Sequence, residues 1–318
     1  MFTTELCDIL KIEYPIILGG MVWIGKSELA AAVSEAGGLG LLAAGGMTLE
    51  EMSEEAEKVR EITSKPFGVN VPLARPDAWD LIERAVKGGA SVVATSAGSP
   101  KKLTGQIKDL GCTVMHVVPS VSFAEKCADA GVDIVIAEGI EAGGHDGFDE
   151  ITTMALIPQV VDAVTVPVVA AGGIADGRGF VAALSLGAKG VQMGTRFVAT
   201  HESAAHPRFK EAILKVGANG TTLTGRTTVG PTRGIKNRLT EMILDAERRG
   251  ATQDEIFDLI GEGRSAIASI EGDIEEGSVY CGQIGGMIRE IKSVKDVIDN
   301  VIREAEAVVR SLQRGISD

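Results

Sequence analysis

Short apolar runs recur from residue 14 to residue 193, separated by segments with helical spacing. Each run is continuously hydrophobic instead of alternating, which is typical of a strand buried on both faces of a parallel sheet. Strands are expected over eight runs: 14–18, 39–43, 67–71, 91–95, 113–117, 134–137, 167–170 and 190–193. Apolar positions at three- and four-residue intervals predict helices over 27–36, 49–62, 76–87, 123–130, 154–164 and 178–186.

Strict alternation of eight strands with helices predicts an α/β protein, a (β/α)8 barrel of the TIM type with functional groups on the loops that follow the strands. An open, doubly wound sheet is the competing architecture. Such a sheet usually has fewer parallel strands, and the GxGxxG turn expected near its start is missing from this sequence. The pattern therefore favours the barrel.

The alternation stops after Met193. Residues 200–285 are mostly helical in pattern around a turn-rich stretch, 217–234, and predict an inserted, mainly helical cap after the eighth strand. Residues 294–312 have the amphipathic pattern of a last outer helix. The expected domains are a barrel, residues 1–199 plus 286–318, and a cap, residues 200–285.

Charge and composition exclude several classes of function. The net charge of −13 argues against a nucleic-acid binder and against attraction to anionic membranes. No apolar run approaches the length of a membrane helix, and the amino end lacks an export signal, so a cytoplasmic location is expected. The four cysteines form no CxxC pair and the four histidines lack metal-binding spacing, so no metal site is expected.

Glycine-bearing loops follow the seventh and eighth predicted strands: Gly172-Gly173 and Gly194-Thr195. In barrels these two loops commonly form a phosphate site. Glycine lets backbone N–H groups approach phosphate oxygens closely, and the Thr195 hydroxyl can donate a hydrogen bond. Tight turns between strand and helix are the alternative, but both loops stand at the strands where a phosphate site is expected.

Three other loops carry candidates for contact with a flat ring. Gly20 and Met21, after the first strand, let the backbone lie against such a ring, although simple packing explains them equally well. Asn70, at the end of the third strand, offers a donor and an acceptor to an imide edge, or serves as a turn-forming residue. Glu138 ends the sixth strand and can hold a ribityl or another sugar-like hydroxyl.

His145 lies in the glycine-dense loop 139–147 after the sixth strand, where neither burial nor helix packing is expected. An imidazole with an ordinary pKa of about 6.5 can take or give a proton near neutral pH. We therefore expect a catalytic or cofactor-contacting role for His145, although a lone histidine is more often structural.

As a set, these motifs resemble the nitronate monooxygenase family, formerly called 2-nitropropane dioxygenase, which includes the FMN-dependent enoyl-acyl-carrier-protein reductase II. The resemblance covers nearly the whole chain and is more specific for the family than for the reaction. It rests on Gly19-Gly20-Met21-x-Trp23 and on the segments 66–70, 141–145, 171–179, 192–197 and 282–287.

The resemblance implies an FMN-dependent oxidoreductase, with NADH or NADPH as reductant in the reductase branch. His145 matches the catalytic histidine of the family. By this resemblance, the two glycine loops hold the FMN phosphate, Asn70 and the Gly20-Met21 backbone hold the ring, and Glu138 holds the ribityl chain. The full set of implied cofactor contacts is Gly20, Met21, Asn70, Glu138, Gly143, Gly144, Gly172, Gly173, Gly194, Thr195, Gln283 and Met287.

Three functions stay open on the sequence: oxidation of alkyl nitronates with O2, or the related quinone reduction; enoyl-acyl-carrier-protein reduction; and flavin binding without turnover. Retention of His145 argues against the last. The stretch 146–152 is longer and more acidic than expected of the reductase, and a −13 surface repels an acidic carrier protein, so the balance leans to the monooxygenase.

A basic stretch complicates that preference, because residues 208–238 hold seven basic residues and one acidic residue. It is either a solvated face of the cap or a landing site for NAD(P)H phosphates or the phosphopantetheine of an acyl carrier protein. The sequence leaves the small-molecule substrate and the oligomeric state open, a homodimer included. The basic residues are Arg208, Lys210, Lys215, Arg226, Arg233, Lys236 and Arg238.

Overall fold

A parallel barrel forms the body of the computed structural model, which describes residues 2–260 and 263–315. Its strands are hydrogen-bonded in the order β1-β9-β8-β6-β5-β4-β3-β2, and a bridge between Ile17 and Leu39 closes the ring. The predicted (β/α)8 architecture is therefore confirmed. The strands are β1 Ile16–Leu18, β2 Gly40–Ala43, β3 Phe67–Pro72, β4 Val92–Ser96, β5 Thr113–Val118, β6 Ile134–Glu138, β8 Val168–Ala171 and β9 Gly190–Met193.

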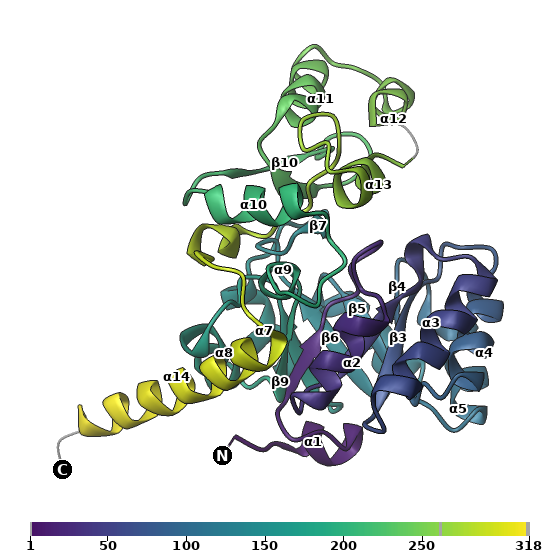
Figure 1. Cartoon of the computed structure of the whole chain (residues 1–318), viewed down its shortest axis with the longest axis vertical. Helices are drawn as coiled ribbons and strands as arrows, with labels where there is room; N and C mark the ends of the chain where they lie inside the picture. The colour runs from purple at the N-terminus through teal and green to yellow at the C-terminus, as the bar shows by residue number, and fades with distance from the viewer. Residues whose placement is uncertain (1, 261–262, 316–318) are drawn as a thin grey trace.

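Helices surround this ring (Figure 1). The last of them, α14 (Val294–Arg314), packs against α8 and α2, as its amphipathic pattern predicts. The short helix α5 was not expected, because six residues are too few to show a helical period. The other outer helices are α2 Ser27–Glu35, α3 Leu49–Ile62, α4 Ala78–Lys87, α5 Thr104–Asp109, α6 Val121–Asp129, α7 Thr153–Ala163 and α8 Gly177–Ser185, with 3-10 turns η1 Ala44–Gly46 and η2 Pro100–Lys102.

The inside of the barrel is apolar at one end and polar at the other. Leu6 and Leu10 of α1 (Glu5–Leu10) join the inner apolar cluster and close the amino end. At the carboxyl end, the pairing aligns Asn70 with Ala94 of that cluster, and it aligns both Gln192 and Glu138 with Ala171. Paired residues of neighbouring strands face the same way, so these polar side chains form the top layer of the interior.

A cap follows β9, as predicted, and stands above the barrel in Figure 1. It has a small apolar core of its own, formed by Leu239, Ile243, Ala246 and Ile256. The short helix α9 Thr195–Val198 follows β9 and packs into the main core. The elements after it are α10 Pro207–Lys215, β10 Thr221–Thr224, β11 Thr232–Ile235, α11 Arg238–Arg248, α12 Gln253–Ile260, α13 Arg264–Ala266, the π-helical turn η3 Ile267–Glu271 and the 3-10 turn η4 Gln283–Met287.

The turn-rich stretch 217–234 holds an antiparallel hairpin, β10 and β11, which the sequence pattern did not indicate. A third strand, β7 (Gly144–His145), comes from the loop after β6 and pairs with β11. We call this three-stranded sheet the ribbon. Because β7 lies in the barrel part of the chain, the ribbon crosses the division at residue 200, and that division stays a prediction.

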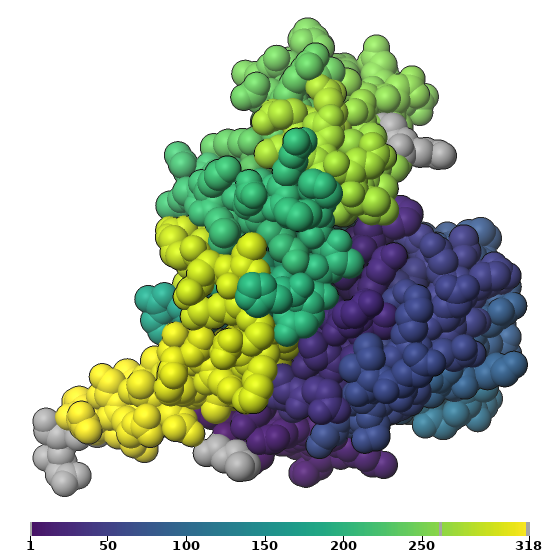
Figure 2. All heavy atoms as spheres, in the orientation of Figure 1, coloured from purple at the N-terminus to yellow at the C-terminus, as the bar shows by residue number. Residues whose placement is uncertain are grey.

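A second link joins barrel and cap. The Trp23 indole N–H donates to the Ser265 hydroxyl at 3.1 Å, and the residues stand 242 positions apart in the chain. In Figure 2 the purple amino-terminal segment meets the base of the green cap. Over the ranges that the structure describes, no helix has both the length and the apolar surface to span a membrane.

Candidate functional site

The loop after β1 lies against Asn70 of β3. A Cβ built on Gly20 would stand 2.2 Å from Asn70 Oδ1, so a side chain at position 20 is excluded. Met21 reaches the loop after β9, where a Cβ on Gly194 would stand 3.6 Å from the Met21 sulfur. The structure therefore brings together Gly20, Met21, Asn70 and Gly194.

The loop after β8 depends on glycine for its backbone. Gly172 and Gly173 both have positive φ, 86° and 76°, a region that residues with a Cβ rarely adopt. A Cβ on Gly172 would also stand 2.5 Å from the carbonyl oxygen of Gly139, in the loop after β6. This pair leaves backbone groups of the loop accessible to a close ligand such as phosphate.

The adjacent helix α8 has its N-terminus capped by a side chain of its own chain. The Asp176 carboxylate caps α8 and accepts hydrogen bonds from the N–H groups of Arg178 and Gly179, at 2.9 and 3.2 Å. Any phosphate here therefore depends on the loop backbone and on Thr195. The Thr195 hydroxyl accepts a 2.9 Å hydrogen bond from Gly282 N–H, which leaves its own proton for a further acceptor.

The segment 281–287 packs against the loop after β6. A Cβ on Gly143 would stand 2.5 Å from Gly282 N, and Gln283 N–H donates to the Glu141 carbonyl at 3.0 Å. Gln283 and Gly143 are thus neighbours, as the candidate set requires. Met287 ends η4 and keeps 45% of its surface exposed.

Glu138 and Gln192 carry polar atoms without protein partners. The described residues give the Glu138 carboxyl no hydrogen bond, and burial raises its pKa to about 7. Gln192 Oε1 is buried and also accepts no hydrogen bond within the described ranges. Buried polar groups usually have partners, so two orphaned groups in one layer suit a ligand that supplies the missing ones.

His145 lies on β7, a strand of the ribbon. The sequence suggested instead that it lies on a free glycine loop. It pairs with Thr232 of β11, and its ring meets the edge of the Tyr280 ring at 5.8 Å between centroids. The side chain is accessible to solvent, yet desolvation by the protein around it lowers its pKa. The imidazole is therefore neutral at neutral pH, which leaves it able to accept a proton.

Sequence reasoning gave Tyr280 and Asp146 no role near His145, and it placed Arg233 only in the basic stretch of the cap. Tyr280 supports the ring, and its backbone bridges to Gly234 of β11. Arg233 is buried and donates from Nε to the Ile140 carbonyl at 2.9 Å. Both oxygens of Asp146 are buried without a hydrogen bond in the described structure. Nothing in the local sequence signals this burial, because it depends on pairing between the loop and β11.

The seven basic residues of 208–238 do not gather as one free face. Lys210 is buried and donates to the carbonyls of Thr200 and Ser203 at 2.7 Å, and Arg233 is buried as described. Arg208 and Lys236 are exposed without an ion pair to the described residues. The remaining three are paired with carboxylates: Lys215 with Glu211, Arg226 with Glu150 and Arg238 with Glu276.

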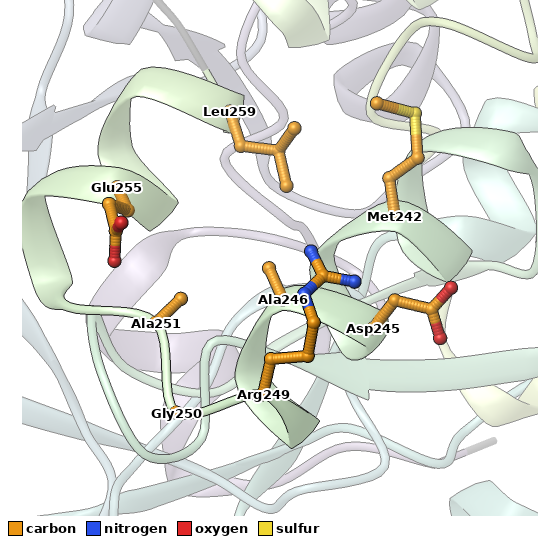
Figure 3. A pocket seen from close by; sticks show the side chains of 8 residues that line it. All are labelled: Met242, Asp245, Ala246, Arg249, Gly250, Ala251, Glu255 and Leu259. Carbon is orange, nitrogen blue, oxygen red and sulfur yellow. The ribbon is translucent and has the colours of Figure 1, made fainter.

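A cavity of about 520 Å³ lies between α11 and α12 of the cap (Figure 3). None of its lining residues belongs to the candidate set, so it is separate from the barrel mouth. Among residues 2–260 and 263–315, no group of three or more His, Cys, Asp or Glu side chains could hold a metal ion. The cavity is lined by Met242, Asp245, Ala246, Arg249, Gly250, Ala251, Glu255 and Leu259.

Comparison with known proteins identifies the family. The model of the nitronate monooxygenase family matches residues 3–88 and 79–304. The chain belongs to the nitronate monooxygenase family. Like the enzymes it resembles, it is an oxidoreductase.

Relatives of this family member carry different activities. FabK from Thermotoga maritima has a solved structure with a TM-score of 0.95 and 43% identity, covering 99% of this chain and 100% of that one. A carboxyl-CoA dehydrogenase of a methyl-oxo-octahydroindene from Mycobacterium tuberculosis is 32% identical over 95% of this chain and 96% of its own. A probable nitronate monooxygenase from Staphylococcus haemolyticus is 36% identical over 77% and 82%. Family membership therefore leaves the reaction to be argued.

Proposed function

We propose that this oxidoreductase holds FMN at the carboxyl ends of the barrel strands and reduces an enoyl thioester with NADH or NADPH. The sequence alone leans to nitronate oxidation. The 43% identity to FabK, an enoyl-acyl-carrier-protein reductase II, over nearly the full length of both chains favours the reductase.

The observation that carries the cofactor assignment is the partnerless polar layer beside the glycine loops. Gly20 leaves room for the backbone to meet a flat ring next to Asn70, whose amide suits the imide edge of that ring. Gln192 Oε1 and the Glu138 carboxyl lie in the same layer with no protein partner among the described residues. A flavin ring and ribityl chain supply the hydrogen-bonding groups that this layer lacks.

The phosphate end of the proposed ligand falls to the other loops. The backbone of Gly172 and Gly173 can approach the phosphate closely because neither residue has a Cβ. The Thr195 hydroxyl accepts from Gly282 N–H, so its own proton can be donated to a phosphate oxygen. FMN held by these residues would supply the hydride-transfer chemistry. The protein supplies position and charge.

His145 acts on the substrate in this proposal. The β7–β11 pairing fixes its backbone, and Tyr280 fixes the ring from the side. A neutral imidazole carries one N–H, which can donate to the thioester carbonyl oxygen and stabilise the negative charge that develops there. Its neutral state at neutral pH follows from the desolvation that lowers its pKa.

Nitronate oxidation is the second candidate. The family match and the Staphylococcus haemolyticus relative favour it, and so does the pairing of three basic residues of 208–238 with carboxylates, which reduces the positive charge open to an acidic carrier protein. In that reaction the neutral His145 would serve as a base toward the acidic carbon of a nitroalkane or orient the nitronate.

An anaerobic experiment separates the two reactions. The purified protein is mixed first with NADH or NADPH and then with a short enoyl thioester, while flavin absorbance is followed. Bleaching by the nicotinamide and recovery with the thioester support the reductase. Bleaching by a nitronate, but by neither nicotinamide, overturns it in favour of the monooxygenase. Mass measurement of the released chromophore tests FMN against FAD.

A further inference from the structure

Asp146 stands directly after the histidine strand, on its other face. The ribbon continues to this residue, because Asp146 N–H donates to the Pro231 carbonyl at 2.9 Å. Side chains alternate between the faces of a strand, so Asp146 and His145 point to opposite sides. Arg233 pairs with Gly144 and therefore shares the Asp146 face. The two consecutive residues 145 and 146 thus place an accessible imidazole on one face of the ribbon and a carboxyl group on the other.

The Asp146 carboxyl is buried without a partner. Both of its oxygens lack a hydrogen bond to any residue that the structure describes. Arg233 is the cation that acts on it, but the Arg233 guanidinium donates elsewhere, to the Ile140 carbonyl at 2.9 Å and the Thr221 hydroxyl at 3.4 Å. No ion pair joins Asp146 and Arg233 in the described ranges, so an ionised carboxylate here would have neither a hydrogen bond nor a direct ion pair to compensate its burial.

The surrounding charges make ionisation still less favourable. Desolvation, followed by the negative charge of Glu138, raises the Asp146 pKa to about 9, and Arg233 offsets only part of this. Ionising a carboxyl group with no donor, next to other carboxyl groups, carries a large desolvation cost. The charged groups that act on Asp146 are Glu138 of β6, Glu141 and Glu150 of the loop after β6, and Arg233 of β11.

We propose that Asp146 is a positioning residue, an uncharged acid held behind the histidine strand so that no negative charge forms beside His145 and Glu138. An anion at this place would favour the imidazolium form of His145 and the protonated form of Glu138. The uncharged acid keeps the imidazole neutral. The effect on turnover rests on the proposed function, whereas the uncharged acid is a property of the protein itself.

The sign of the effect on stability follows from proton linkage. In the unfolded chain Asp146 ionises with a pKa near 3.9, and in the folded protein with a pKa of about 9. The folded state therefore binds more protons than the unfolded state between these pH values, and Asp146 makes the protein less stable as the pH rises from about 4 to about 9. A neutral side chain at this position removes that dependence.

The first test measures melting temperature from pH 4 to pH 9 on the full-length protein at matched cofactor content. Asp146→Asn is expected to melt higher than the wild type at pH 8, with the difference vanishing near pH 4. If asparagine disturbs the packing at position 146, Asp146→Ser is a second neutral variant. Its melting temperature relative to wild type must still rise with pH. A variant that melts lower than wild type at pH 8 by a margin absent at pH 4 would show a stabilising carboxylate and overturn the proposal.

A matched control is expected to change the melting temperature at pH 8 in the opposite direction. The Arg75 guanidinium lowers the pKa of the Asp77 carboxyl through a 2.7 Å ion pair, so Asp77→Asn is expected to lower the melting temperature at pH 8. Turnover is then measured against pH with whichever substrate is accepted. The wild type is expected to lose activity above about pH 9, because the Asp146 anion that then forms opposes the negative charge that develops on the substrate beside His145, and Asp146→Asn is expected to keep its activity. Equal alkaline losses in both proteins would reject the positioning role, whichever reaction the enzyme catalyses.

Discussion

The two ends of the barrel are closed by opposite kinds of side chain. At the amino end, Leu6 and Leu10 of α1 enter the inner apolar cluster and are 0% and 3% exposed. At the carboxyl end, the same inner face carries Asn70, Glu138 and Gln192. Burying apolar surface stabilises the fold, whereas burying a polar group without a partner costs free energy.

The apolar amino end and the polar carboxyl end of the barrel therefore serve stability and function, respectively. The amino end contributes folding free energy through the inner apolar cluster, whose described members include none of the candidate residues. The carboxyl end gives up part of that free energy to hold groups such as Glu138, whose pKa is raised to about 7 by burial. Substitutions at the two ends should therefore affect different measurements. Three predictions test this separation, and a fourth tests the link between the barrel and the cap.

The largest effect is expected at the carboxyl end, where Gly173→Asp should abolish FMN binding in a folded protein. A Cβ at this position would stand 3.3 Å from the Glu141 Cβ, and the added carboxylate would repel the phosphate. Flavin absorbance of the purified variant measures it. Gly131→Asp is the matched control: Gly131 also has positive φ, 79°, but a Cβ there meets nothing within 4 Å. Retained flavin in Gly173→Asp would move the phosphate site elsewhere.

His145→Ala should lower turnover by about 10²- to 10⁴-fold, the usual contribution of a positioned acid or base. Folding and flavin content should persist, because the β7–β11 pairing uses the backbone and not the imidazole. Steady-state rates at matched flavin occupancy provide the measurement. His201→Ala, which changes an exposed histidine of the cap, should leave turnover within about threefold. Activity of His145→Ala within the same range would make this histidine structural.

At the amino end, Leu6→Ala should lower the free energy of unfolding by about 2–5 kcal/mol, the usual loss for a buried leucine. Turnover at a temperature where the variant is folded should be unaltered. Denaturant unfolding measures the loss, and Ile9→Ala on the same helix, 39% exposed, should change stability by no more than about 0.5 kcal/mol. A loss of flavin or turnover in folded Leu6→Ala would show that the two ends are coupled.

The smallest effect concerns the link between barrel and cap. Trp23→Phe removes the indole N–H that donates to Ser265, at a cost of about 0.5–1.5 kcal/mol. We expect faster amide exchange in α13 with little change in the barrel strands. Trp79→Phe, on α4 of the barrel, removes a partly buried indole that packs against the main core and should leave α13 unaffected. Equal amide exchange rates in α13 of Trp23→Phe and wild type would show that the Trp23–Ser265 hydrogen bond does not help to hold the cap on the barrel.

Much of the barrel could be predicted because its elements are encoded locally. The run 134–137 is continuously apolar and becomes β6, extended by one residue to Glu138. Gly172 and Gly173 stand where the backbone needs positive φ, which few other residues tolerate. The hairpin β10–β11 was missed because its strands are four residues long and mostly polar, so no alternating apolar pattern marks them.

The sequence indicated which residues belong to the candidate site but not how they are arranged in space. Sequence motifs indicate His145 and the glycine loops, yet they give no sign that His145 is held on a strand or that Tyr280 lies against its ring. They also overstate the basic stretch, because the pairing of Arg226 with Glu150 joins positions 76 residues apart. Such contacts depend on where distant segments meet.

The sequence by itself determined the class of fold, the order of the strands along the chain and the loops that carry the chemistry, because hydrophobic period and glycine placement act over a few residues. Only the tertiary structure decided the electrostatics around the histidine. Pairing of residues 144–145 with 232–233 buries Asp146 behind the strand, and the closure of the barrel turns Glu138 and Gln192 into one inner layer. Burial without a partner is a property of the assembled fold, so no local pattern predicts it.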